Sequence, residues 1–343
     1  MKSNRDVTIY DVARLLNLSP STVSRALKNH PHIKKETRKK IITVANEMGY
    51  RQNKFASNLR QKRTNTIGVV LPRLDSYFMA SVISGIEKIT SEKEYGLIIS
   101  QSQETWKKEA TCISTLFNSR VDGLLVSLAF DTRNLNHFDI FFSKGIPVIF
   151  FDRVSDCSDC MNIIIDNYKA GYEATSHLIG QGCRRIVYLG GNMLRNVYSE
   201  RFRGYRQALS DNNLEFDHSL HISGDMTGQF GKDAAAKILR MKSRPDGLFA
   251  ANDSTAVAAI VEFKKEGIKV PEDIAVAGFN NEPVSKVVEP NLTTVDYPAM
   301  EMGKIAATSL IDMLNNSMHA DVSTIVLKHN LIVRGSSVRT NNK

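Results

Sequence analysis

The stretch from Val7 to Leu27 reads Val7-Thr-Ile-Tyr-Asp-Val-Ala-Arg-Leu-Leu-Asn-Leu-Ser-Pro-Ser-Thr-Val-Ser-Arg-Ala-Leu27, and it predicts two short helices joined by a tight turn. Thr8 can cap the first helix, because Asp11 stands three positions later and completes a capping-box-like start. Apolar residues then recur at helical spacing, which indicates a buried stripe on this helix. These residues are Ile9, Val12, Leu15 and Leu16.

A second helix is predicted directly after the break at Asn17-Leu18. Ser19 can cap it, and Pro20 then takes the first helical position, where its missing N–H costs nothing. Arg25 points outward and is long enough for a bidentate contact to guanine. The inward residues are Val23, Ala26 and Leu27, and the other outward residues are Ser21, Thr22 and Lys28. With a third helix from about Lys35 to Met48, this pattern is typical of a helix-turn-helix.

The positive charge of the chain is concentrated in its first fifth. The protein has 343 residues and a net charge of +9. Residues 1–65 hold 15 Lys and Arg against 4 Asp and Glu, whereas the remaining residues hold 30 against 32. Lys and Arg bind a phosphate backbone with release of condensed counterions, so this asymmetry indicates nucleic-acid binding. A solvated basic tail would explain the charge alone, and an ordinary three-helix bundle would explain the apolar stripe alone.

A short amphipathic segment follows the third helix, which ends at Gly49-Tyr50. Between Asn53 and Arg60, the residues Phe55, Ala56 and Leu59 form one stripe. Eight residues are too few for a stable isolated helix. We therefore expect this hinge to fold only when DNA and a second copy of the chain hold it, with Leu59 inserted as a wedge into the minor groove.

These features resemble the headpiece and hinge of the lactose/galactose-repressor family of transcription regulators. The similarity has no gaps and covers Val7 to Leu27, Thr37-Arg38, Gly49-Tyr50, Asn53 and Leu59. It implies that Pro20, Ser21 and Arg25 read bases in the major groove and that Leu59 intercalates. Gln52 departs from the proline of many members, which implies a less stiff hinge entry. Further contacts to DNA or within the hinge are expected from Thr8, Tyr10, Ser19, Thr22, Ser24, Asn29 and Asn53.

From Ile67 onward, short apolar strands alternate with amphipathic helices. Continuous apolar strands separated by helices indicate doubly wound parallel sheets, and this region is too long for one core, so two lobes are expected. The predicted strands are Ile67–Leu71, Leu97–Ser100, Gly123–Val126, Val148–Phe151, Ile163–Ile165, Ile186–Gly190, Leu248–Ala251 and Ile274–Gly278. The predicted helices include Tyr168–Ile179, Ser199–Asp211, Gly231–Met241 and Ser254–Glu266.

Polar and aromatic side chains gather where these strands end, which is where ligands bind to such sheets. Two aromatics with several Asp, Asn and Arg side chains suit a hydroxyl-rich ligand such as a sugar. Taken singly, Asp253 reads as a helix cap, Arg201 as a surface charge and Phe78 as core. Their placement at successive strand ends indicates a site instead. The candidates are Tyr77, Phe78, Asp152, Arg153, Arg195, Arg201, Asn252, Asp253 and Asn280, with Asn281 beside the last.

The family resemblance extends over this region and implies a periplasmic-binding-protein-like core that closes on its effector. It implies ligand contacts from Asp152, Arg201, Asn252 and Asn280, with Tyr77, Phe78, Arg153, Asp253 and Arg195 as neighbours. Asn280 departs from the usual aspartate, and an amide can both donate and accept. Met226 stands where a purine-binding relative has a stacking phenylalanine, which counts against a purine effector.

Other functional classes lack their sequence signatures. There is no P-loop and no G-x-S-x-G motif, and Gly190-Gly191-Asn192 is too short for a dinucleotide fingerprint, so we expect neither catalytic residues nor a cofactor. Cys157 and Cys160 lack a second ligand pair, so we expect two free thiols and no metal site. No apolar run approaches the ~18–20 residues that span a membrane. With no apolar signal core, a cytoplasmic protein is expected, rather than a secreted sugar-binding transport protein.

The sequence thus predicts a small all-α headpiece at 1–50, a hinge at 51–65 and a two-lobed α/β core at 66–343. One lobe is expected to comprise about 66–165 and 296–325, and the other about 166–295 and 326–343. Because one helix-turn-helix reads only a half-site, we expect a homodimer on palindromic double-stranded DNA. The predicted function is a repressor whose operator affinity is controlled by a small-molecule effector, a sugar or sugar derivative.

Overall fold

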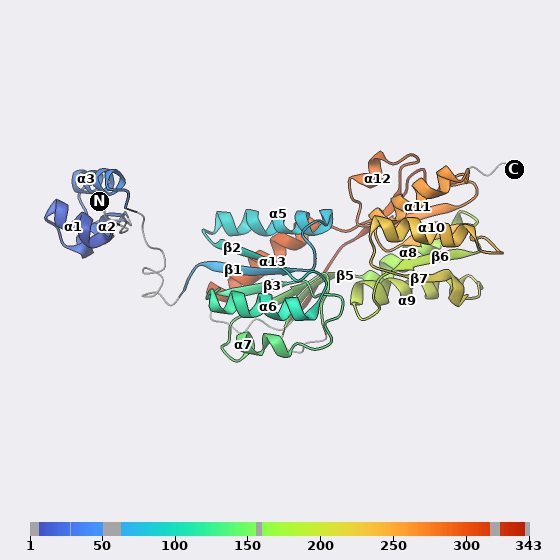
Figure 1. The fold of residues 1–343 in the computed structure, drawn as a ribbon, viewed down its shortest axis with the longest axis horizontal. Helices are drawn as coiled ribbons and strands as arrows, with labels where there is room; N and C mark the ends of the chain where they lie inside the picture. The colour runs from blue at the N-terminus through green and yellow to red at the C-terminus, as the bar shows by residue number, and fades with distance from the viewer. Residues whose placement is uncertain (1–6, 28, 51–62, 156–159, 316–322, 340–343) are drawn as a thin grey trace, which may run out of the picture. The chain divides into compact units, whose positions relative to one another are not determined.

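A computed structural model describes residues 7–27, 29–50, 63–155, 160–315 and 323–339. The chain forms two compact units, divided between Thr64 and Asn65. The first unit is a small group of helices, and the second contains two β-sheets flanked by helices (Figure 1). The hinge residues Asn53 and Leu59 lie outside the described residues, and their roles remain predictions.

The first unit is a bundle of three helices, α1 (Ile9–Leu16), α2 (Pro20–Leu27) and α3 (Lys35–Glu47). At the start of α1, the backbone N–H of Thr8 donates to the Asp11 carboxylate at 2.9 Å, as the predicted capping box requires. The prediction for Leu15 was wrong, because its side chain is 64% exposed while Leu16 is half-buried. The buried core of the unit consists of Val12, Ala13, Val23, Ala26, Ile41 and Ala45.

One lobe of the second unit, here called the N-lobe, contains six parallel strands in the order β11-β5-β4-β3-β1-β2. Helices α5 (Tyr77–Glu92) and α13 (Ala299–Asn315) pack together on one face of this sheet, and α6 (Trp106–Asn118), η1 (Asn136–Phe138) and α7 (Asp139–Phe142) cover the other. The strands are β1 (Thr66–Leu71), β2 (Gly96–Gln101), β3 (Gly123–Val126), β4 (Val148–Phe151), β5 (Met161–Ile165) and β11 (Thr324–Leu327).

The other lobe, here called the C-lobe, has the strand order β12-β10-β9-β8-β6-β7, and only β12 is antiparallel to its neighbour. Helices α8 (Asn167–Gly180) and α9 (Asn196–Asp211) cover one face, and α10 (Gly228–Leu239) and α11 (Asp253–Lys265) cover the other. The short helices η2 (His218–Leu220) and α12 (Val284–Val287) lie in connections. The strands are β6 (Ile186–Gly190), β7 (His221–Ser223), β8 (Gly247–Ala250), β9 (Ala275–Phe279), β10 (Thr293–Asp296) and β12 (Asn330–Ile332).

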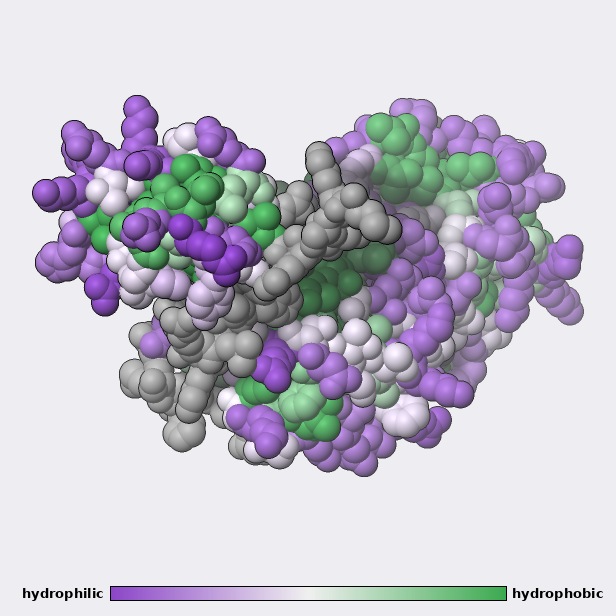
Figure 2. All heavy atoms as spheres, turned by 60° about the vertical axis from the view of Figure 1, so that its left-hand side comes forward, coloured by the Kyte–Doolittle hydropathy of each residue, from purple (hydrophilic) through white to green (hydrophobic). Residues whose placement is uncertain are grey.

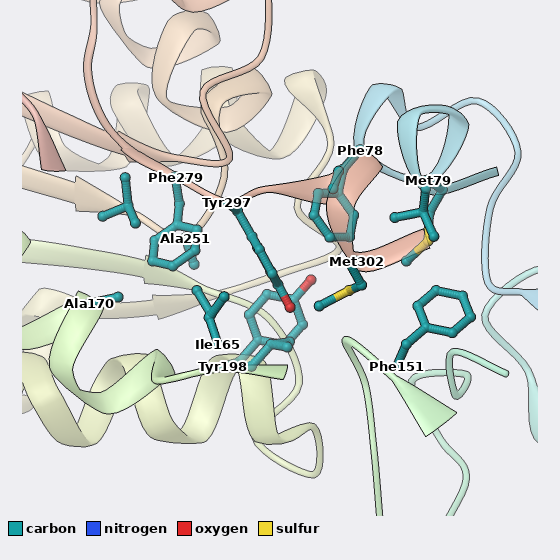
Figure 3. Close-up of a cluster of buried hydrophobic side chains, with 14 of the residues drawn as sticks. Phe78, Met79, Phe151, Ile165, Ala170, Tyr198, Ala251, Phe279, Tyr297 and Met302 are labelled. Atoms are coloured by element: carbon teal, nitrogen blue, oxygen red, sulfur yellow. The ribbon is translucent and has the colours of Figure 1, made fainter. Parts of the chain in front are cut away.

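The two lobes share one continuous hydrophobic cluster. The chain passes between them three times, after β5, after β10 and after β11. Tyr297 lies in the second of these connections, and its ring centroid is 4.5 Å from that of Phe78 in the N-lobe (Figure 3). Phe279 of the C-lobe belongs to the same cluster, and its ring centroid lies 6.1 Å from that of Tyr297. Aromatic side chains therefore pack against one another where the two lobes meet.

The predicted fold class is confirmed, and the bounds of β3, β4 and β6 are those predicted from the sequence. Four strands escaped prediction: β7, β10, β11 and β12. The strands β7 and β12 have only three residues each. In β11 the residues alternate between exposed and half-buried positions, and β10 has the largely polar sequence Thr-Thr-Val-Asp. Such short or polar runs lack the apolar continuity that marks a buried parallel strand.

Hydrophilic side chains cover most of the face shown in Figure 2, with apolar patches between them. Within the described ranges, no helix has the length and apolar character needed to cross a membrane.

The expectation of free thiols in the Cys157–Cys160 loop was wrong for Cys160, which is buried and disulfide-bonded. Cys157 lies outside the described residues. Cys112 and Cys183 are free cysteines.

Candidate DNA-binding surface and effector site

Helix α2 presents one polar face to solvent. Ser21 and Arg25 are exposed, and because they are four residues apart they lie on the same side of the helix. On the opposite side, Val23 and Ala26 are almost completely buried in the core of the bundle, which fixes the rotation of α2. The surface formed by Ser21 and Arg25 is therefore held rigidly outward, as insertion into a DNA groove requires.

The start of α2 is fixed by a network of short hydroxyl side chains. The backbone N–H of Thr22 donates to Ser19 Oγ at 3.1 Å, which is the predicted N-cap. Ser19 Oγ also lies 2.8 Å from the hydroxyl oxygens of both Ser21 and Thr22. Pro20 opens the helix as expected, and these small residues leave its N-terminus accessible to a phosphate or a base edge.

The remaining predicted DNA contacts lie around this helix. Tyr10 is 64% exposed, and Ser24 is half-buried. The Thr8 hydroxyl contacts the Asp11 carboxylate at 2.6 Å, so its first role is to cap α1. Asn29 adopts a left-handed backbone with φ 59° after α2, and its side-chain oxygen accepts a hydrogen bond from Arg38 of α3.

A cavity of about 300 Å³ lies between the two lobes of the second unit. It opens at the carboxyl ends of the parallel strands, where the doubly wound topology places ligands. Seven of the nine predicted effector residues line it: Tyr77, Phe78, Asp152, Arg153, Arg201, Asn252 and Asn280.

Asp152 links the N-lobe to the segment around Tyr297, where the chain passes between the two lobes. It follows β4 with a left-handed backbone (φ 59°), and its side chain is 5% exposed. One carboxylate oxygen accepts a hydrogen bond from the Tyr297 hydroxyl at 3.1 Å, and the other accepts from Ser127 at 3.4 Å. Burial raises the pKa of this carboxyl, against the opposing effect of the charges on Arg153 and Arg201.

Arg201 of α9 is the buried cation of the C-lobe wall. Its guanidinium lies flat over Phe279, 3.5 Å from the ring centroid. Nε donates to Asn167 Oδ1 at 2.9 Å, and Nη1 donates to the carbonyl oxygen of Ala251 at 2.8 Å. Among the residues that the structure describes, Nη2 makes no hydrogen bond, so its two N–H groups remain for a ligand.

Arg153 is held in place by contacts from both lobes. Nη1 forms an ion pair with Glu104 at 2.7 Å, and Nη2 donates to the hydroxyl of Tyr198, which belongs to α9 of the C-lobe, at 3.3 Å. The guanidinium also lies 4.4 Å from the ring centroid of Phe130. Arg153 therefore forms part of the contact between the lobes as well as part of the cavity wall.

The C-lobe rim of the cavity is built from amides and hydroxyls. Asn252 caps α11 by accepting from the backbone of Thr255 at 2.9 Å, while its amide nitrogen donates to the carbonyl of Met226 at 2.8 Å. Asn280 follows β9 with φ 104°, and its amide nitrogen donates to Glu282 at 3.3 Å. These side chains present both donors and acceptors to a ligand, as recognition of hydroxyl groups requires.

Two predicted effector residues do not line the cavity. Arg195 precedes α9 and extends across to the N-lobe, where it donates to the carbonyl of Thr132. Asp253 is fully buried behind the rim, where it accepts from the backbone N–H of Glu282 at 2.7 Å and from the Thr294 hydroxyl at 2.6 Å. These side chains lie outside the cavity wall because a position near a strand end does not fix the direction in which the side chain points.

Comparison with known proteins agrees with this architecture. Residues 8–53 match the bacterial regulatory proteins of the lacI family, and residues 175–337 match the periplasmic binding protein-like domain. Catabolite control protein A of Priestia megaterium is 30% identical over 97% of this chain and 99% of its own length. The chain belongs to the lacI family.

Solved structures of similar fold cover most of this chain. The complex of the transcriptional regulator CelR with cellobiose has a TM-score of 0.73 and 28% identity, over 96% of this chain and 99% of its own. The lac repressor dimer bound to operator and to the anti-inducer ONPF has a TM-score of 0.88 and 23% identity, over 98% and 100%. This lacI-family protein is thus a transcriptional regulator with a DNA-binding headpiece and an effector-binding core.

Several cavity residues of this lacI-family regulator were missed by sequence reasoning. Glu104 comes shortly after β2, and the strand-end rule that selected Asp152 would have found it. Asp225 follows β7, a strand too short to be predicted. Tyr198 carries no local signal, because it lies within helix α9. Glu282 comes two positions after Asn280, but a surface loop reads the same way in the sequence.

Proposed function

We propose that this regulator is a repressor that binds palindromic operator DNA as a homodimer, under the control of a sugar or sugar derivative. We assign residues 1–50 to the headpiece, 51–65 to the hinge and 66–343 to the effector-binding and dimerisation core. The observation that carries the proposal is the rigid outward face of Ser21 and Arg25, on a unit that holds the whole basic excess of the chain.

In the proposed complex, α2 enters the major groove and Arg25 makes a bidentate contact to guanine. Pro20 and Ser21 allow close approach to the neighbouring bases, and the two copies of Leu59 wedge into the minor groove at the operator centre. The remaining contacts, which position the headpiece on phosphates or hold the hinge, come from Thr8, Tyr10, Ser19, Thr22, Ser24, Asn29 and Asn53.

The proposed effector lies in the cavity between the lobes, in contact with Asp152, Arg201, Asn252 and Asn280. A carboxylate, a guanidinium donor and two amides suit a ligand with many hydroxyl groups. Tyr77 and Phe78 add aromatic surface on the N-lobe side. The solved complex of CelR with cellobiose supports a sugar, and it comes from a chain that is 28% identical.

Effector binding alters operator affinity only if it favours one arrangement of the lobes over another. Arg153 and Asp152 make contacts that span the lobes, so a ligand in the cavity favours a closed arrangement. We propose that closure changes the spacing of the two hinges in the dimer and thereby their ability to fold as paired helices. By linkage, operator DNA then changes effector affinity by the same factor.

The protein acts without catalysis in this proposal, and it resides in the cytoplasm, at the nucleoid when bound to operator. The cavity residues make contacts that suit binding: the Asp152 carboxylate is held by two hydroxyls, and Arg201 lies against a ring.

Replacement of Arg25 by alanine tests the DNA-binding proposal. The preferred site is first selected from a random duplex library, and binding is then measured for all single-base variants of that site. We expect Arg25→Ala to lose discrimination at one base pair of each half-site, at a cost of about 1–3 kcal/mol, with salt-dependent nonspecific binding retained.

Lys40→Ala is the matched control, because Lys40 is an exposed cation of α3 outside the α2 face. A lost phosphate contact weakens binding to every sequence about equally, so this variant keeps the base preference. Unchanged discrimination in Arg25→Ala would show that another residue reads the bases.

A further inference from the structure

Glu282 is a buried carboxylate in the cavity wall, and none of the described residues forms an ion pair with it. Its side chain is 7% exposed, and it lines the cavity beside Asn280 and Ser254. One carboxylate oxygen accepts from the Asn280 amide at 3.3 Å, and the other accepts from the Ser254 hydroxyl at 3.0 Å. Both donors are neutral. In the part of the chain that the structure describes, neither a lysine nor an arginine forms an ion pair with Glu282.

The cations of the cavity are already engaged elsewhere. Arg73 forms two hydrogen bonds with Asp75 at 2.7 and 2.9 Å, and Arg153 is paired with Glu104. Arg201 donates to Asn167 and Ala251 and lies on Phe279. The described lining residues include five carboxylates and three guanidinium groups. The cavity lining therefore has two more carboxylates than guanidinium groups, and the carboxylates on the C-lobe side are Glu282 and Asp225.

A second carboxyl group, that of Asp253, lies directly behind Glu282. Asp253 is fully buried, and its carboxylate accepts from the backbone N–H of Glu282 at 2.7 Å and from the Thr294 hydroxyl. Burial, with a smaller contribution from the neighbouring Glu282 carboxylate, raises the pKa of Asp253 to about 8, so Asp253 is largely protonated at pH 7. Burial also raises the pKa of Glu282. Among the described residues, no lysine or arginine forms an ion pair with either carboxyl group, which leaves a place beside Glu282 for a positive charge from outside the protein.

At the mouth of the cavity, Asp225 adds a third carboxylate on the same side. Its side chain is exposed, and it accepts from the backbone N–H and the hydroxyl of Thr227 at 3.0 and 2.8 Å. Like Glu282, it is held by neutral donors. A positively charged ligand that approaches the cavity thus meets an exposed carboxylate before it reaches the buried one.

We propose that Glu282 makes the cavity selective for an effector with a protonated amine, such as an amino sugar, over its neutral hydroxyl counterpart. The ammonium group donates to the Glu282 carboxylate, in the role that Arg73 plays for Asp75 and Arg153 plays for Glu104. The hydroxyl groups of the ligand contact Asp152, Asn252 and Asn280. This inference rests on the proposed sugar-sensing function and names the chemical class of its ligand.

The test uses the full-length protein and sugars that differ in a single group. Glucose and galactose are compared with glucosamine and galactosamine, and with N-acetylglucosamine, whose amide carries no charge. Dissociation constants are measured by calorimetry at pH 7, where the amines are protonated. We expect each amine to bind at least ten-fold more tightly than the corresponding neutral sugar and the N-acetyl derivative.

Glu282→Gln preserves the shape of the side chain and removes its charge. We expect this variant to bind amine and neutral sugars within a factor of two of each other, while its thermal unfolding in the absence of ligand shows that it is folded. Glu272→Gln is the matched control: Glu272 is an exposed residue of the same lobe and does not line the cavity. It should retain the full preference for amines.

The possible outcomes separate the inference from the function on which it rests. Equal or tighter binding of the neutral sugars by the wild-type protein overturns the preference for a cation and leaves sugar sensing intact. A preference that persists in Glu282→Gln overturns the assignment to Glu282. If neither class of sugar binds, the proposed sugar effector itself is wrong and the inference fails with it.

Discussion

Replacement of Arg201 by alanine is expected to abolish the response to effector, with at least a 100-fold loss of affinity for the ligand. Arg201 is 3% exposed, and its guanidinium is fixed by Phe279, Asn167 and Ala251, so the N–H groups of Nη2 bind a ligand without further loss of side-chain entropy. A hydrogen bond from a charged donor contributes about 1.5–3 kcal/mol, and truncation also leaves the Asn167 and Ala251 oxygens without this partner.

The measurement is calorimetry with whichever sugar or amino sugar stabilises the wild-type protein, combined with operator binding in the presence of that ligand. We expect Arg201→Ala to bind operator in the absence of ligand and to be insensitive to the ligand. Arg201→Lys is the informative comparison, because lysine keeps the charge but lacks the planar fork that bridges two acceptors and lies on the ring. Wild-type ligand affinity in Arg201→Ala would remove Arg201 from the effector site.

The second large effect is expected from Gly171→Ala, which acts on the contact between α8 and α9. A Cβ atom at Gly171 would lie 2.3 Å from the carbonyl oxygen of Arg201 and 2.8 Å from its Cα atom. Because both atoms belong to the backbone of a packed helix, the two helices must separate to admit the methyl group. We expect the free energy of unfolding to fall by about 3 kcal/mol, at the upper end of the usual cost of overpacking.

The same substitution is expected to weaken effector binding, because the displaced backbone carries Arg201. Chemical denaturation and calorimetry measure the two effects on one protein sample. The control is Gly180→Ala at the other end of α8, where a Cβ atom meets no atom within 4 Å. Since alanine favours a helix over glycine by up to about 1 kcal/mol, this variant should be as stable as the wild type or slightly more so. Equal stability of both variants would contradict the tight helix contact.

Local chemistry was sufficient to predict the headpiece. Helix α2 starts at Pro20 under a Ser19 cap, as expected from residues that are adjacent in the chain. The exposed position of Arg25 follows from the spacing of Val23 and Ala26 on the opposite face. Leu15 shows the limit of this reasoning: a single turn of α1 offers more apolar residues than the small core can cover, and the sequence does not say which one remains exposed.

In the core, the sequence by itself determined the apolar strands and the polar residues at their ends, because both are properties of short contiguous segments. Tertiary structure alone decided which of those residues share a cavity. Arg195 and Arg201 both follow β6, yet one crosses to the loop after β3 and the other lies on Phe279, since each direction is set by a surface far away in the chain. Tertiary structure also decided the partners of Glu282, because the Ser254 hydroxyl that donates to its carboxylate comes from a distant part of the chain.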